Sequence, residues 1–296
     1  LTSVIDANEH RDVMTCDIPN AFIQAEMPIV KEGDEKVLMK ITGVLVDMLV
    51  EINPMLYGPC VVYENSRKVL YVQVLRAIYG MLIAGVLWYN KLRGGLEGHG
   101  FKFNPYDPCC ANRTQKGSQQ TVLFHVDDLK SSHKDKRVND EFDKWLQKTY
   151  GEHGPVTAHR GKIHQYLGME IDYSEDNKVK INMSKYVEDM LNDFPQKFKS
   201  TEVAKTPAGN GLFNQGQGGK LNQERADIYH TTVARGLFLC KRACPDIQPT
   251  IKVLCMRVKE PNEADWAKLI QLMKYLNGTR RKKITLSADN KRCKKW

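Results

Sequence analysis

The sequence predicts an α+β fold in which an antiparallel sheet flanked by helices precedes a mostly helical C-terminal region. In the first two thirds of the chain, short strand-like segments alternate with apolar residues at helical spacing. Three helical patterns then follow a segment rich in Gly, Asn and Gln at 208–219. With 296 residues, 42% of them apolar, the chain can fill the core of one large domain or two moderate ones.

The first elements place a carboxylate at the end of a strand. Residues 13–18 are predicted to form a short strand, followed by a turn at Pro19 and Asn20 and a short helical stretch at 21–23. Asp17 therefore lies where the strand ends. In the segment 32–51 a charged loop precedes the apolar run 44–50, which fits either a buried helix or a strand pair. Residues 69–75 alternate as a strand.

A long amphipathic helix and a β-hairpin follow. Residues 79–96 carry apolar side chains at helical spacing up to a stop at 98–100. The apolar positions are Tyr79, Leu82, Ile83, Val86, Tyr89, Leu92 and Leu96. Residues 121–126 are predicted as a strand, Asp127 and Asp128 as a tight turn, and 129–132 as the antiparallel partner. A second core helix is expected over 138–150, with Val138, Phe142, Trp145, Leu146 and Tyr150 facing inward.

The remaining elements are two strands and four helices. Strands are expected at 166–173 and 179–183, and a short helix at 186–194. Beyond the Gly-rich segment, helices are expected at 225–242, 247–258 and 260–277. The last of these has Pro261 in its first turn and Asn277 and Gly278 as its stop.

Composition limits the class of protein. The formal net charge is +9 and the pI is about 9.0, which suits a polyanionic partner such as nucleic acid. The eight cysteines lack the dense spacing of a secreted disulfide scaffold and are read as reduced intracellular thiols, and no Cys or His grouping has zinc-site spacing. The longest uncharged apolar stretch, around residues 81–89, is far shorter than the roughly 18 residues that span a membrane.

Three aspartates are candidate metal ligands. Asp17 at a strand end and Asp127 and Asp128 at a hairpin tip come together if the two strands are neighbours. Mg²⁺ prefers carboxylate oxygens, and a two-metal site needs only two or three of them on rigid elements. The alternative is structural, because aspartate is also a good turn and helix-capping residue.

The context of these aspartates resembles the reverse transcriptases of copia-type retrotransposons. Residues 16–23, which begin Cys16-Asp17, are similar to that family's first catalytic motif, and Phe124 to Asp128 stand where the family has Tyr-Val-Asp-Asp. Other matches follow in the family's order along nearly the whole chain. They are residues 78–80, 88–89, 100–109, 166–168, 229–234, 245–247, 265–266 and 274–279.

The resemblance implies an RNA-directed DNA polymerase that uses two Mg²⁺ or Mn²⁺ ions. Asp17, Asp127 and Asp128 would be the metal ligands and catalytic carboxylates. Phe22 would lie beneath the sugar of the incoming dNTP, where a bulky ring excludes a 2′-hydroxyl; its alternative is an ordinary core aromatic. His125 stands where the family has tyrosine, which places a titratable ring beside the metal site.

The resemblance also implies an organisation and partners. The expected divisions are a palm with partial fingers at 1–173, a thumb-like strand and helix at 174–207, a linker at 208–224, a helical connection at 225–285 and the start of a ribonuclease H region at 286–296. The chain would then be an excised piece of a polyprotein. Its partners would be RNA template, DNA primer, dNTPs, integrase and ribonuclease H, with no membrane. Synthesis would take place in the cytoplasm, within a virus-like particle, and the product would act in the nucleus.

Two departures leave alternatives open. The helix after Gly80 carries Leu82, Ile83, Gly85 and Val86, where the family commonly has a Lys-Gln pair and a Pro-Arg step. The family's upstream fingers segment would precede Leu1. A second hypothesis is therefore a degenerate element that binds nucleic acid without catalysis, and a third is a nuclease that uses the same carboxylates.

Overall fold

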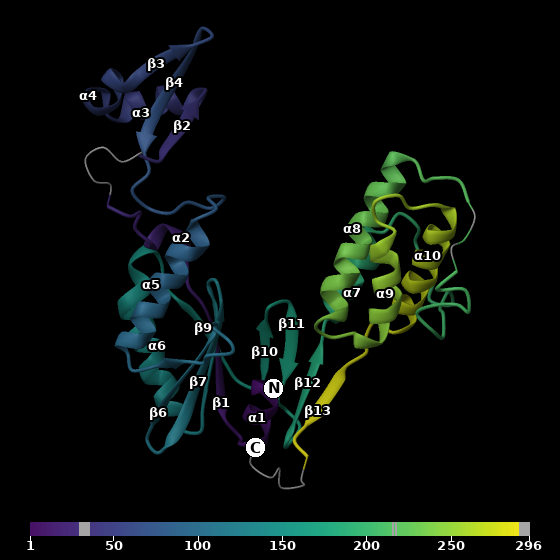
Figure 1. Cartoon of the computed structure of the whole chain (residues 1–296). Helices are drawn as coiled ribbons and strands as arrows, with labels where there is room; N and C mark the ends of the chain where they lie inside the picture. Colours follow the sequence, from purple (N-terminus) through teal and green to yellow (C-terminus); the bar gives the residue numbers. More distant parts are fainter. Residues whose placement is uncertain (30–35, 215, 217, 290–296) are drawn as a thin grey trace.

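The computed structural model describes residues 1–29, 36–214, 216 and 218–289. Over this range the protein combines helices with antiparallel sheets, so the predicted α+β class is confirmed. Figure 1 shows four parts: a small lobe of β2–β4, a six-stranded sheet with its helices, a four-stranded sheet, and a helical lobe. No helix within the described ranges is long and apolar enough to cross a membrane.

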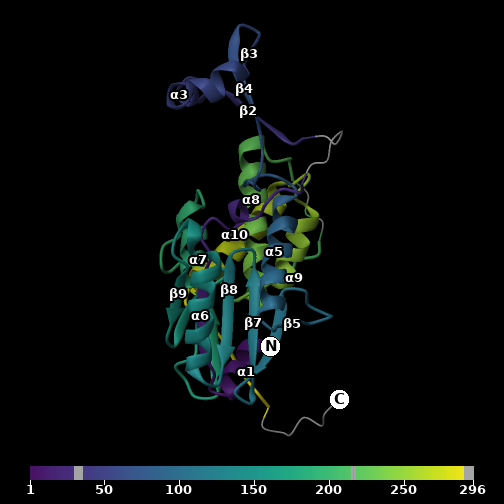
Figure 2. The same cartoon turned by 90° about the vertical axis from the view of Figure 1, so that its left-hand side faces the viewer.

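The largest sheet has six strands. Its strand order is β5-β6-β7-β8-β1-β9, and every neighbouring pair is antiparallel. Helices α5 and α6 cover one face of this sheet (Figures 1 and 2). The bounds are β1 (Asp12–Asp17), β5 (Lys102–Phe103), β6 (Cys110–Gln115), β7 (Ser118–His125), β8 (Asp128–His133), β9 (Thr157–Arg160), α2 (Ala21–Gln24), α5 (Ala84–Gly98) and α6 (Lys136–Tyr150).

Alternation along β1 explains why one face is apolar and the other polar. Met14, Cys16 and Ile18 belong to the buried cluster under α5 and α6. Because successive side chains of a strand point to opposite faces, Thr15 and Asp17 project from the other side. The strands predicted at 13–18, 121–126 and 129–132 are confirmed as β1, β7 and β8. The predicted ends of β1 and β8 differ from the observed ones by one residue, whereas β7 begins earlier than predicted, at Ser118.

Two sequence predictions in this part need correction. The helix expected from Tyr79 begins at Ala84, because Gly80 has φ +95° and residues 79–83 form turns. The buried stripe is accordingly Ala84, Trp88, Leu92 and Leu96, while Leu82 is fully exposed. In the hairpin, the two loop residues are Val126 and Asp127, and the residue predicted as second in the turn, Asp128, opens β8 instead. The corrected register puts Asp128 on a rigid strand.

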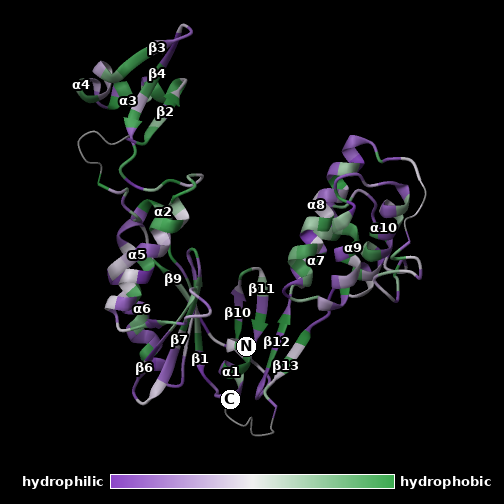
Figure 3. Ribbon diagram, viewed as in Figure 1, coloured by the Kyte–Doolittle hydropathy of each residue, from purple (hydrophilic) through white to green (hydrophobic). Residues whose placement is uncertain are grey.

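The small lobe consists of β2 (Leu38–Thr42), α3 (Val44–Ile52), α4 (Pro54–Tyr57), a 3₁₀ turn at Gly58–Cys60, β3 (Val61–Glu64) and β4 (Arg67–Gln73). The apolar run 44–50 is a helix, and of its residues only Val46 is buried. Figure 3 colours much of the ribbon of this lobe as hydrophobic. The start of the predicted charged loop, residues 32–35, lies outside the described residues.

A four-stranded antiparallel sheet, β10-β11-β12-β13, lies between the six-stranded sheet and the helical lobe (Figure 1). The bounds are α1 (Thr2–Asn8), β10 (Ile163–Tyr166), β11 (Met169–Asp172), β12 (Lys178–Asn182) and β13 (Ile284–Ser287), with a 3₁₀ turn at Gly151–His153 between α6 and β9. The single strand predicted at 166–173 is wrong, because the structure has two strands there, β10 and β11. Leu167 and Gly168 have φ of +51° and +77°, so the chain turns there between two strands. The sequence reading did not include β13.

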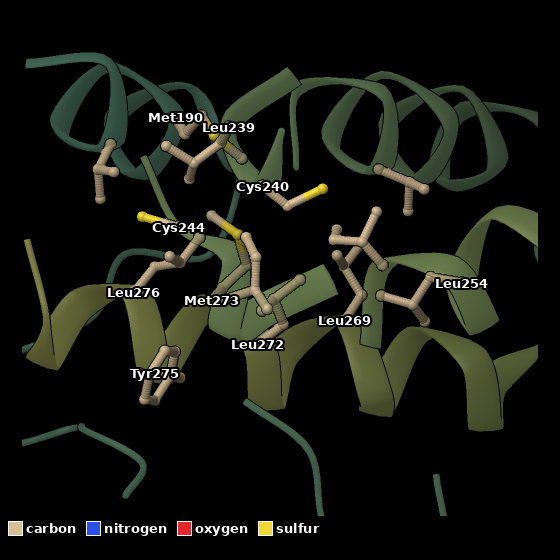
Figure 4. Packing of buried hydrophobic residues seen from close by; sticks show 14 of the residues in the cluster. Met190, Leu239, Cys240, Cys244, Leu254, Leu269, Leu272, Met273, Tyr275 and Leu276 are labelled. Atoms are coloured by element: carbon tan, nitrogen blue, oxygen red, sulfur yellow. The ribbon is translucent and has the colours of Figure 1, made fainter. Parts of the chain in front are cut away.

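The helical lobe packs around one hydrophobic cluster. Figure 4 shows side chains from all four helices of this lobe, among them Met190, Leu239, Leu254 and Met273, meeting in it. The bounds are α7 (Ser184–Asp193), α8 (Gln223–Cys240), a 3₁₀ turn at Pro245–Ile247, α9 (Gln248–Met256) and α10 (Glu263–Gly278). These agree with the four predicted helices, except that Pro261 precedes α10 and Asn262 caps it. Residues 215 and 217 of the predicted linker and 290–296 of the predicted final region lie outside the described residues.

Candidate active site

The site is built on the sheet face opposite α5 and α6. Asp17, the last residue of β1, lies directly opposite Asp128, the first residue of β8. His125, the last residue of β7, lies opposite Asp128 on its other side. Asp127 occupies the hairpin loop between them. The fold therefore brings the three predicted aspartates together with His125 at the ends of three adjacent strands.

The backbone around the carboxylates is held from both sides. The Ile18 amide donates a hydrogen bond to the Asp127 carbonyl at 3.1 Å, which joins the end of β1 to the hairpin loop. The Trp88 indole N–H donates to the Val126 carbonyl at 2.7 Å. Val126 has φ +59°, a conformation that β-branched residues rarely adopt.

The negative charges of the three carboxylates repel one another. Burial raises the pKa of Asp17 above its ordinary value, and the charge of Asp127 raises it further. The pKa of Asp128 is raised by burial, then by Asp127 and Asp17, while His125 has a smaller lowering effect. Carboxylates that raise one another's pKa are suited to share a cation, which would remove the repulsion.

Within the described residues, no group of three or more His, Cys, Asp or Glu side chains is arranged as a metal centre. The donor set nevertheless fits a hard divalent cation, because the converging groups are carboxylates and their mutual repulsion favours added positive charge. Asp17, Asp127 and Asp128 are the side chains that would hold it. The three-aspartate metal assignment remains a prediction.

A cavity of about 210 Å³ adjoins the two paired aspartates. It lies between β1, β8 and β9 on one side and β10 on the other. Its lining residues are Thr15, Cys16, Asp17, Asp128, Thr157, Ala158, His159, Gln165 and Tyr166. The sequence predicts Tyr166 only as the first residue of a strand and as part of the family resemblance, not as a site residue. The pairing of β9 with β1 brings Thr157 opposite Asp17, and sequence spacing did not indicate that neighbourhood.

Phe22 lies on α2, the short helix that follows Asp17 in the chain. The ring is half-buried and contacts the ring of Tyr79, with centroids 4.7 Å apart. Burial raises the pKa of Tyr79, and the charges of Asp127 and Asp17 raise it further, so the Tyr79 phenol lies within electrostatic reach of the site. Phe22 and Tyr79 together form an aromatic wall beside the aspartates.

Comparisons with known proteins identify the family of this sequence. The sequence matches the family described as "Reverse transcriptase (RNA-dependent DNA polymerase)" over residues 1–208. Among solved structures, the chain is similar to a Candida tropicalis telomerase in complex with a TWJ fragment of telomeric RNA, with a TM-score of 0.38 and 10% identity over 95% of this chain and 46% of that one. The apo form of telomerase from the same organism matches with a TM-score of 0.37 and 11% identity over 92% of this chain and 45% of that one. A Candida albicans telomerase in complex with a TWJ fragment of telomeric RNA also matches, with a TM-score of 0.32 and 9% identity over 94% of this chain and 48% of that one.

The structural similarities are weak, and this chain spans about half the length of those telomerase chains. The family match is independent of them and covers more than two thirds of the sequence, including Asp17, Phe22, His125, Asp127 and Asp128. The chain belongs to the reverse transcriptase (RNA-dependent DNA polymerase) family.

Proposed function

We propose that this chain is the catalytic core of an RNA-directed DNA polymerase that transfers a nucleotide from a dNTP to a primer 3′-hydroxyl on an RNA or DNA template. The observation that carries the proposal is the cross-strand pairing of Asp17 with Asp128, with Asp127 at the adjoining turn. Carboxylates fixed at strand ends are what a two-metal phosphoryl-transfer site needs from a protein.

Two Mg²⁺ or Mn²⁺ ions would be held by Asp17, Asp127 and Asp128. When bound, such ions activate the attacking 3′-oxygen and neutralise charge on the reacting phosphate. The protein's own contribution is to keep the three carboxylates on a rigid backbone. The strand pairing of β1 with β8 and the hydrogen bond from Ile18 to Asp127 supply that rigidity.

Phe22 is proposed to select deoxyribonucleotides. Its ring is supported by Tyr79, whose phenol lies within electrostatic reach of Asp127 and Asp17. A supported ring cannot move aside easily, so a 2′-hydroxyl above it would clash. His125 is exposed and pairs with Asp128, so it would lie adjacent to the metal site.

The source is proposed to be a copia-type retrotransposon, on the strength of the ordered motifs in the sequence. RNA template, DNA primer, integrase and ribonuclease H would then be partners, and synthesis would take place in a cytoplasmic virus-like particle. The net charge of +9 supports binding to a nucleic-acid backbone.

Primer extension on an RNA template with Mg²⁺ and dNTPs tests the proposal. The wild-type chain is expected to extend the primer, and Asp127→Asn is expected to abolish extension. Asp189→Asn, an exposed aspartate on α7, is the matched control and should extend normally. Equal extension by Asp127→Asn and wild type would contradict the proposal. Salt-dependent duplex binding with no incorporation by wild type would support the binding-only alternative.

A further inference from the structure

The hairpin between β7 and β8 has an unusual residue at its tip. His125 pairs with Asp128, so Val126 and Asp127 are the two loop residues. Val126 has positive φ, +59°, and Asp127 is not among the non-glycine residues with positive φ. Positive φ at the first loop position alone is the pattern of a type II′ turn, which normally has glycine there.

The type II′ turn has a close competitor. Types I′ and II′ differ mainly in the orientation of the peptide between the two loop residues, which here is the Val126–Asp127 peptide. Rotation of that peptide would make φ of Asp127 positive and would change which rotamers its side chain can adopt. Something other than the local sequence must hold this turn, because both turn types need positive φ at Val126 and valine does not favour it.

Trp88 fixes it from below the sheet. The indole N–H donates to the Val126 carbonyl, the oxygen of the peptide that would rotate, at 2.7 Å. The next carbonyl, that of Asp127, accepts the Ile18 amide at 3.1 Å. Both carbonyls of the loop are therefore held, one by a side chain of α5 and the other by the end of β1.

Trp88 is itself held rigidly. The side chain is 1% exposed and continues the buried stripe of α5. Tyr150 at the end of α6 meets the Trp88 ring edge to face, with centroids 5.6 Å apart and planes at 72°. The Tyr150 carbonyl accepts a hydrogen bond from Gln24, which also donates to the Pro19 carbonyl just after Asp17. The support for the turn therefore reaches both strands that carry the aspartates.

We propose that Trp88 is a positioning residue that selects the turn geometry of Val126 and Asp127 and thereby aims the Asp127 carboxylate. This inference rests on the proposed polymerase function for its effect on activity. The hydrogen bond and its effect on the turn do not depend on that function.

The test compares Trp88→Phe, which keeps an aromatic ring and removes the N–H, with Trp145→Phe. Trp145 lies in the same core, stacked on His99 and Phe142. Amide hydrogen exchange of residues 125–129, measured without metal, should accelerate by about tenfold or more in Trp88→Phe and stay near wild type in Trp145→Phe. With Mg²⁺, kcat for dNTP incorporation should fall by about 10- to 100-fold in Trp88→Phe alone, as for other groups that orient metal ligands.

A rescue variant separates positioning from general loss of packing. Glycine adopts positive φ without strain, so Val126→Gly in the Trp88→Phe background should restore both slow exchange at 125–129 and most of kcat. Unchanged exchange in Trp88→Phe would overturn the proposal whatever the activity. Failure of Val126→Gly to restore exchange would also overturn it. An inactive wild type with the predicted exchange pattern would instead overturn the proposed function and leave the role of Trp88 standing.

Discussion

Neutralising Asp17 should stabilise the metal-free protein. Asp17 and Asp128 face each other across an antiparallel pair and Asp127 adjoins them, so their charges repel when no cation is present. A like-charge pair directly opposite on two strands destabilises by roughly 0.2–1 kcal/mol. Because Asp17 is largely exposed, solvent screening keeps the effect within this range. Asp17→Asn should therefore raise Tm by about 1–3 °C in EDTA at neutral pH.

The Tm difference between Asp17→Asn and wild type should shrink as the pH falls. The pKa values of Asp17 and Asp128 are raised in the folded protein, so the folded state binds protons more readily than the unfolded state. The wild-type penalty is therefore present above the raised pKa values and absent below the ordinary carboxylate value of about 3.9. The Tm advantage of Asp17→Asn should disappear near pH 4.

Added Mg²⁺ should make wild type more stable than Asp17→Asn. At a concentration ten times its dissociation constant, a bound ion stabilises wild type by about 1.4 kcal/mol, and Asp17→Asn should gain less because it has lost a ligand. Differential scanning fluorimetry with and without Mg²⁺ measures both effects. The reasoning would be refuted if Asp17→Asn were less stable than wild type in EDTA, or if both proteins gained equally from Mg²⁺.

Three further predictions concern other parts of the structure. Phe22→Ala should raise incorporation of ribonucleotides relative to deoxyribonucleotides by roughly 10- to 100-fold in single-nucleotide assays, and an unchanged ratio would exclude the proposed steric role. Lys130→Met removes the partner of buried Asp6 and should cost about 3–5 kcal/mol in urea unfolding, whereas the exposed control Lys134→Met should cost less than about 1 kcal/mol; equal losses would contradict the buried ion pair. Gly236→Ala would place a Cβ 2.3 Å from Ile251 Cδ1 and should destabilise by about 1–3 kcal/mol. Gly85→Ala, which meets nothing within 4 Å, should stabilise by up to about 1 kcal/mol.

The parts predicted well from sequence are those in which local pattern and tertiary packing agree. The alternation around Met14, Cys16 and Ile18 shows in the sequence because one sheet face is buried under helices. The helix predicted at 138–150, which is α6 (Lys136–Tyr150) in the structure, shows for the same reason, since Val138, Phe142 and Leu146 face one core. The strand-end position of Asp17 and the turn position of Asp127 follow directly from these patterns.

The parts that could not be predicted depend on backbone geometry or distant pairing. Leu82 and Val86 continue an apolar period, but both are exposed. The turn at Gly80 leaves Leu82 before the helix, and Val86 is two residues from Trp88 and so lies off the buried face of α5. Positive φ at Val126 has no sequence signal, because valine disfavours it, and the hydrogen bond from Trp88 links residues 38 positions apart. The neighbourhood of Asp17 and Thr157 depends on the pairing of β1 with β9, which no local pattern specifies.

The most direct test of the central claim is single-nucleotide incorporation under single-turnover conditions, with Mg²⁺ and an RNA template. The proposed function predicts that wild type and the exposed control Asp189→Asn incorporate a dNTP at the same rate. Asp17→Asn, Asp127→Asn and Asp128→Asn should each lose on the order of 10²-fold or more, since each removes a group that stabilises transition-state charge. Incorporation at the wild-type rate by any of these three variants would contradict the assignment of that aspartate to the site.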